Sequence, residues 1–226
     1  ALDLARSIEH PRFIALSSSI LAQLHYVRED FSKASTELQR AISIQREIDD
    51  DAGLAYSYLN FGKIFSVKKN IQRATEYFNL SETLYQQLDD TEGLGMVNLN
   101  RGVLVLNAAE RPHQALGLFN AAEEKLQTSD NEYERARLHY YRGRAYQIME
   151  LWDQALKNGR ESLKISEQNN FGGMIVFSSN LLSEIHEDAG NYKESLDYLH
   201  ASNNMKDSLY NLSREALTSD ASARYG

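Results

Sequence analysis

The sequence predicts an all-α protein, an α-α superhelix of five stacked helix-turn-helix repeats. The main observation is a small residue that returns about every 40 residues within apolar helical stretches, at Ala22, Gly62, Gly102, Gly143 and Ser183. A second small residue follows twelve or thirteen positions later, at Ala34, Ala74, Ala115, Ala155 and Ser195. A fixed period of this length is typical of stacked units, none of which can bury its apolar face alone.

Each repeat is expected to hold two helices, because apolar residues recur at helical spacing on both sides of a short polar break. In the second repeat one such run extends from Leu54 to Phe65, and the next begins at Ile71. Asn70 between them is a good N-cap, and Gly190 in the fifth repeat suits a left-handed helix end. Further polar caps are expected at Asp30, at Asn191 and within the segments 49–53, 89–93, 129–132 and 169–172.

The same signals divide the chain into parts. Residues 1–10 are expected to end a preceding repeat, because their sequence matches the segment that follows residue 40. The five repeats are predicted at about 11–50, 51–90, 91–130, 131–170 and 171–207, and residues 208–226 as a C-terminal helix leading to a missing output domain. Pro11 and Pro112 stand where a helix would begin. The unbroken period predicts one continuous superhelix without a linker.

Glycine inside a helix is about 1 kcal/mol less favourable than alanine, so three glycines at one repeat position imply a steric reason. Close contact between the two helices of a repeat is that reason. We expect Gly62 to face Phe78 and Gly102 to face Phe119.

These residues resemble the tetratricopeptide repeat (TPR) family. The resemblance covers residues 12–207 and is carried by Asn60-Phe61-Gly62 with Phe65, Ala74, Phe78 and Ser81, and by Arg101-Gly102 with Ala115, Phe119 and Ala122. The resemblance implies a non-catalytic solenoid whose first helices line a concave groove for a peptide or protein segment. The period of about 40 instead of 34, and the missing closing proline, resemble the longer repeats of bacterial sensory and regulatory proteins.

The C-terminal segment sharpens this resemblance. Residues 207–211, followed by Arg224-Tyr225, look like the exit from the last repeat of bacterial signalling proteins, which leads to a coiled coil and a histidine kinase or GGDEF-type diguanylate cyclase. Small or apolar residues follow heptad spacing at Leu209, Leu212, Ala216, Ser219 and Ala223. The helix is expected to cap the last repeat, to transmit a signal, or both, and a homodimer through it is a further expectation.

The candidate ligand site is the exposed face of the first helices, found by stepping three and four residues from each small residue. Leu59, Leu99 and Phe177 fall on the projected face. The candidate binding residues on it are Tyr56, Asn60, Lys63, Asn100, Arg137, Tyr140, Tyr141, Arg144 and Asn180.

Together these side chains suit an extended peptide with an acidic group or a free carboxylate. Lys63, Arg137 and Arg144 would form a basic patch, the asparagines would bind peptide backbone, and the tyrosines would stack. The alternative is a solvated helix face with ion pairs within the helices and no ligand.

Catalysis and cofactors are not expected. The chain has no cysteine, no His-x-x-x-His pair and no glycine-rich phosphate loop, and its six histidines are scattered. Glu184, Glu187 and Asp188 are read as a solvated face rather than a metal site. His186 and Trp152 are expected to be packing residues.

The net charge of −8 disfavours nucleic acid and anionic membranes as partners, and no apolar run approaches the length of a bilayer span. The absence of cysteine fits a periplasmic location but does not require one.

Three interpretations of function remain at this point. The leading one is the sensory or regulatory region of a bacterial signal-transduction protein, and the second is a constitutive scaffold for protein partners. The third is a hydrolase or metal-dependent enzyme on a helical solenoid.

Overall fold

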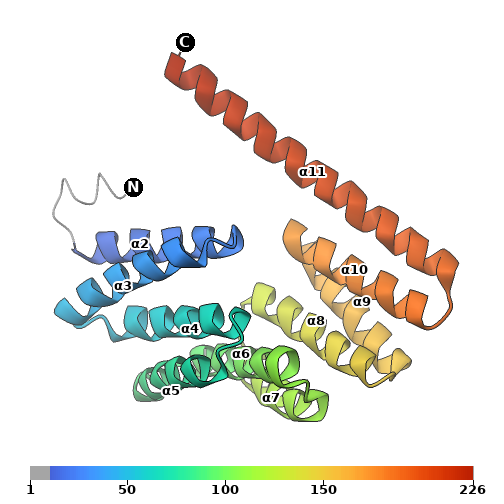
Figure 1. Cartoon of the computed structure of the whole chain (residues 1–226), viewed down its shortest axis with the longest axis horizontal. Coiled ribbons are helices and arrows are strands. Elements are labelled where there is room, and N and C mark those ends of the chain that lie inside the picture. The colour runs from blue at the N-terminus through green and yellow to red at the C-terminus, as the bar shows by residue number, and fades with distance from the viewer. Residues whose placement is uncertain (1–10, 226) are drawn as a thin grey trace. The chain divides into compact units, whose positions relative to one another are not determined.

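The computed structural model describes residues 11–225, with side chains up to residue 215. The described residues form ten helices and no strand, so the all-α class and the repeated helix pairs are confirmed (Figure 1). The helices are α2 (Pro11–Val27), α3 (Phe31–Glu47), α4 (Asp51–Val67), α5 (Ile71–Gln87), α6 (Thr91–Ala109), α7 (Pro112–Leu126), α8 (Glu132–Ile148), α9 (Trp152–Gln168), α10 (Gly172–Asp188) and α11 (Tyr192–Tyr225).

The 40-residue period has a simple cause. Most of the helices contain 17 residues and a three-residue turn follows them, so two helices with their turns make one repeat. Each turn closes the helix with a backbone bond such as that from Asp50 N–H to the Gln45 carbonyl, 2.9 Å. In each three-residue turn, the residue before the N–H donor has a positive φ angle and so a left-handed backbone conformation. These residues are Glu29, Asp49, Lys69, Asp89, Glu150, Asn170 and Gly190. The sequence predicted this conformation only at Gly190.

Most of the predicted N-caps are confirmed. The side chains of Asp30, Asp50, Asn70, Asp90 and Asn131 accept hydrogen bonds from the backbone N–H three residues on. These bonds satisfy donors that have no partner within the helix.

The expectation of a polar cap in segment 169–172 is wrong. The N-cap of α10 is Phe171, whose side chain makes no cap hydrogen bond. Its ring packs edge-on against Tyr133, with centroids 5.4 Å apart, so apolar contact has taken the place of the cap.

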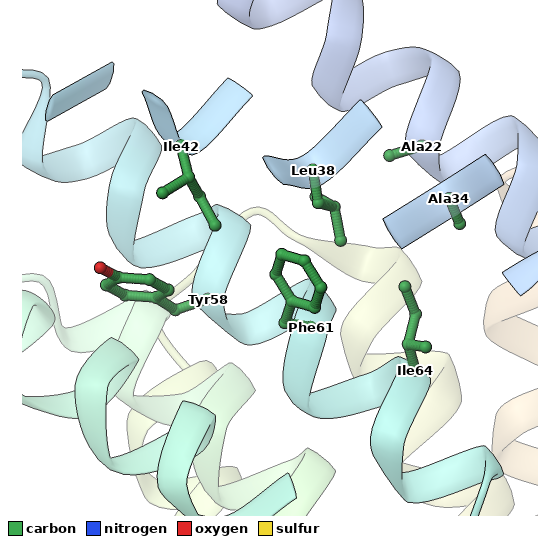
Figure 2. Packing of buried hydrophobic residues seen from close by; sticks show 7 residues of the cluster. All are labelled: Ala22, Ala34, Leu38, Ile42, Tyr58, Phe61 and Ile64. Atoms are coloured by element: carbon green, nitrogen blue, oxygen red, sulfur yellow. The ribbon is translucent and has the colours of Figure 1, made fainter. Parts of the chain in front are cut away.

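The described residues fall into two compact units, one up to Leu126 and one from Gln127 onwards. In the first unit, each first helix (α2, α4, α6) packs on the second helix of its own repeat, and α4 also packs on both α2 and α6. Its core includes the cluster shown in Figure 2: Ala22, Ala34, Leu38, Ile42, Tyr58, Phe61 and Ile64.

The glycine contacts within this unit are as predicted. A Cβ atom added to Gly62 would overlap the ring of Phe78, which is fully buried, and the same holds for Gly102 against Phe119. Helix α4 can therefore approach α5 this closely only because residue 62 has no side chain.

In the second unit α8 packs on α9 and α10, and α10 packs on α9 and α11. Trp152 packs against the core of Ala155, Leu181 and Ile185, as expected. His186 is buried and stacks on Tyr198 of α11 with ring centroids 5.6 Å apart, which agrees with a packing role.

Helix α11 is the second helix of the fifth repeat and runs without a break into the C-terminal segment. Leu209 on α11 packs against Gly172 at the start of α10, so the residues after it extend beyond that helix (Figure 1). Ala216, Ser219 and Ala223 of the predicted heptad lie outside the side chains described. Continuity of the superhelix across residue 126 stays a prediction.

Candidate functional site

In the first unit, three predicted site residues lie on α4 and contact one another. Lys63 donates to the Asn60 amide oxygen (3.2 Å), and the Asn60 amide nitrogen donates to the Tyr56 carbonyl (3.1 Å). The Tyr56 hydroxyl accepts a bond from Gln23 of α2, and the Lys63 ammonium lies 5.5 Å from the centroid of Tyr26. Asn60 is buried, and Tyr56 and Lys63 are half-buried, so these side chains join the neighbouring first helices α2 and α4.

Asn100 occupies on α6 the place that Asn60 has on α4. Its amide donates to the Met96 carbonyl at 2.7 Å, and the residue is buried. Leu59 and Leu99 are buried too, at 2% and 0% exposure, so their expected place in the groove lining is wrong. They point into the helix pair because each lies about a third of a turn from the outward face.

In the second unit the candidate residues on α8 meet α10. Arg144 forms an ion pair with Glu184, 2.7 Å from nitrogen to oxygen, and Gln147 donates to Asp188 at 2.9 Å. Residues one repeat apart thus bind each other across the two first helices. The Arg144 side chain is still 38% exposed, and Glu184 is 50% exposed.

Aromatic side chains lie beside this ion pair. Tyr140 contacts Tyr141 edge-on (5.0 Å) and Phe177 of α10 (6.0 Å), and Phe177 is 54% exposed. Burial raises the pKa of Tyr140 to about 12, so its hydroxyl stays neutral. We call Tyr140, Tyr141, Arg144 and Phe177 the α8–α10 face.

Arg137 is less available than predicted. Its side chain is 12% exposed, pairs with Glu134 at 2.6 Å and lies over the ring of Tyr141. Burial disfavours the charged form, but Glu134, Tyr141 and Tyr133 together outweigh it and raise the pKa of Arg137, so the guanidinium stays charged. Asn180 is half-buried on α10.

The structure brings together Tyr56, Asn60 and Lys63 on α4, and separately the residues of α8. Lys63 belongs to the first unit, and Arg137 and Arg144 belong to the second. A basic patch shared by all three therefore stays a prediction.

Sequence reasoning missed a pocket of about 760 Å³ in the first unit, lined by residues of α3, α4 and α5. A signal for it was present in the sequence, since Tyr58 and Phe61 are aromatic where the next repeat has Asn98 and Arg101.

Within the described part of the chain, no group of three or more histidine, aspartate and glutamate side chains is placed to hold a metal ion. Glu184 and Asp188 are engaged with α8 instead. None of the described helices is both long and apolar enough to cross a bilayer.

No family model matches the sequence, and no curated protein does. Solved structures do match. BtubC (BKLC) from P. vanneervenii is 18% identical over 92% of this chain and 86% of its own, with a TM-score of 0.67. A signal transduction ATPase of Pyrococcus horikoshii with a tetratricopeptide repeat sensor has a TM-score of 0.69 at 15% identity, over 90% of this chain and 31% of its own.

A Podosopora anserina protein described as a kinesin light chain with nearly identical TPR-like repeats aligns over 89% of this chain and 98% of its own, with 14% identity and a TM-score of 0.58. The chain has the tetratricopeptide-repeat fold. At these identities the likeness shows the fold of this TPR chain alone.

Proposed function

We propose that this TPR chain is a non-catalytic module that binds a peptide or protein segment, and that it is the sensory or regulatory region of a bacterial signal-transduction protein. TPR repeats present helix faces built for such partners, and one protein of similar structure carries its repeats as a sensor.

The observation that carries the proposal is the α8–α10 face. Phe177 leaves more than half of its surface in solvent beside Tyr140, and the Arg144 guanidinium lies on the same pair of helices. An exposed aromatic residue next to a partly exposed arginine is typical of a binding hot spot. The ligand is an extended segment with an acidic group, which would replace Glu184 on Arg144 while an apolar side chain covers Phe177.

The test is a thermal-shift and mass-spectrometry screen of the purified protein against peptide pools with free acidic C-termini. A ligand at 100 times its Kd stabilises the folded state by about 2.7 kcal/mol, which shifts the melting temperature measurably. The main variant is Arg144→Ala. Lys164→Ala on α9 is its matched control, because it also removes the cation of an exposed ion pair.

Stabilisation by a defined peptide that is lost in Arg144→Ala and kept in Lys164→Ala would support the proposed site. Stabilisation that both variants keep would place the ligand elsewhere. If no pool stabilises the protein, the peptide ligand is refuted and a folded partner becomes the better hypothesis.

The regulatory role rests on α11, which packs on α10 and continues beyond it. A ligand on α10 is expected to move α11 relative to α9. Spin labels on α9 and α11 would report that distance with and without the peptide, and an unchanged distance would favour a constitutive scaffold.

A further inference from the structure

We call the pocket lined by α3, α4 and α5 the α3–α5 pocket. It lies on the side of the first unit that is formed by the second helices α3 and α5, with α4 between them. Its volume of about 760 Å³ is in the range of ligand sites in proteins. Figure 2 shows the rings of Tyr58 and Phe61, which reach from α4 towards Ile42 and Leu38 of α3. The pocket is distinct from the outward face of the first helices.

The floor of this pocket is aromatic. The ring of Tyr77 lies 4.9 Å from Phe61 and 5.5 Å from Phe65 between centroids, nearly parallel to both, and 6.0 Å from Tyr58. Such stacking holds the rings in place and offers a fixed apolar surface. Leu80 at the rim is 47% exposed and enlarges this surface.

Two arginines of the lining are held by these rings. The Arg46 guanidinium donates to the Tyr58 hydroxyl at 2.8 Å, and that of Arg73 lies 5.3 Å from the centroid of Phe65. Among the described residues neither arginine forms an ion pair. A guanidinium that is oriented but unpaired is prepared to bind a carboxylate through two hydrogen bonds.

In the next repeat, an ion pair occupies the position that corresponds to the α3–α5 pocket. Arg101 stands where Phe61 stands one repeat earlier, and it binds both carboxylate oxygens of Glu82, at 2.9 and 2.8 Å. Glu82 in turn has the repeat position of Ile42. At the α3–α5 pocket the buried residues Phe61 and Ile42 replace this ion pair, so no such pair of charged side chains closes the pocket.

The spacing of the two rings that hold the arginines guides the choice of ligand. Tyr58 and Phe65, which hold them, are seven residues apart on α4, so the two anchors are about 10 Å apart along the helix. Two residues three positions apart in a polyproline II segment lie on one face and about 9 Å apart. Glu47 and Glu76 on the rim are exposed, and their carboxylates suit peptide N–H groups.

We propose that the α3–α5 pocket binds an extended peptide segment in which two acidic residues, three positions apart, flank an apolar side chain. The acidic residues bind Arg46 and Arg73, and the apolar side chain lies on Tyr77 and Leu80. This site goes beyond the proposed function, because it uses the second helices of the repeats.

The test is isothermal titration calorimetry of the whole chain with short peptides blocked at both ends. Each peptide has two glutamates three positions apart and Leu, Phe or Met after the first, and each has a control with both glutamates replaced by glutamine. Arg46→Gln and Arg73→Gln should each weaken binding about tenfold, as expected for loss of a charge-assisted hydrogen bond. Arg40→Gln, on α3 but outside the lining, is the matched control and should bind as the wild type does.

Leu80→Ala provides a second variant that leaves the core intact and should weaken binding, because it removes exposed apolar surface on which the ligand's apolar side chain would lie. Arg144→Ala should leave this binding unchanged, which separates this site from the α8–α10 face. The proposal is overturned if the acidic peptides do not bind at millimolar concentration, if the glutamine controls bind equally well, or if Arg46→Gln behaves like Arg40→Gln.

Discussion

Substitution of Gly62 by alanine tests the packing that sets the repeat. The new Cβ atom would lie 3.0 Å from Cζ of Phe78 and closer still to two other ring atoms. Phe78 has no exposed surface and belongs to the core cluster of α4, α5 and α6, so its ring cannot turn away without displacing neighbours.

The magnitude follows from two opposing effects. Alanine is favoured over glycine in a helix by about 1 kcal/mol, and a methyl group forced into a packed core costs typically about 1–3 kcal/mol. The overlap with a rigid ring puts the cost at the upper end of that range. The net loss of unfolding free energy should therefore be about 2 kcal/mol.

Gly117→Ala is the matched control, because Gly117 is exposed on α7 and an added Cβ would have no neighbour within 4 Å. It should raise stability by about 1 kcal/mol through helix propensity alone. Urea unfolding followed by circular dichroism measures both variants. If Gly62→Ala stabilises the protein as Gly117→Ala does, the steric explanation of the glycines is wrong.

Substitutions test three further features. Burial lowers the pKa of His186, so the unfolded chain binds more protons below about pH 6.5 and stability should fall as the pH drops through that value. His186→Phe should reduce this loss in melts at pH 5.0 and 7.5, whereas His200→Gln on the exposed side of α11 should not. Lys69→Gly should raise the unfolding free energy by about 0.5–1 kcal/mol, because residue 69 has a left-handed backbone conformation that glycine adopts more easily. Gly190→Ala should lower the unfolding free energy by about 1 kcal/mol for the same reason. If urea unfolding shows that both substitutions change stability in the same direction, this explanation is wrong. Arg101→Gln should cost about 1 kcal/mol in urea unfolding, since it removes a partly buried pair of charge-assisted hydrogen bonds, and an unchanged midpoint would show that this ion pair adds nothing.

The backbone of this chain is largely predictable because its rules are local. Asp30 and Asn70 cap helices, Gly190 ends one, and Gly62 admits Phe78, each as its type and repeat position indicated. The left-handed residues at Asp49 or Lys69 were not predicted, since no glycine marks them and the helix-closing hydrogen bonds impose the conformation.

The candidate site was harder to predict, because a helical projection shows on which side of its helix a side chain lies but not which residues of other helices it contacts. Arg144 and Glu184 differ by one repeat and both lie outward, yet only the packing of α8 on α10 decides that they bind each other. Leu59 lies close enough to the projected face to be included in the predicted groove lining, although neighbouring helices bury it. The α3–α5 pocket depends on three helices and becomes visible in the sequence only when Phe61 is compared with Arg101.

The central claim is that the α8–α10 face receives a peptide or protein segment. Hydrogen exchange of the whole chain, measured with and without the peptide that the screen selects, tests it most directly. The account predicts slower exchange in α8 around Tyr140 to Arg144 and in α10 around Phe177, and no change in α9. Protection confined to α9, or none at a saturating peptide concentration, would contradict it.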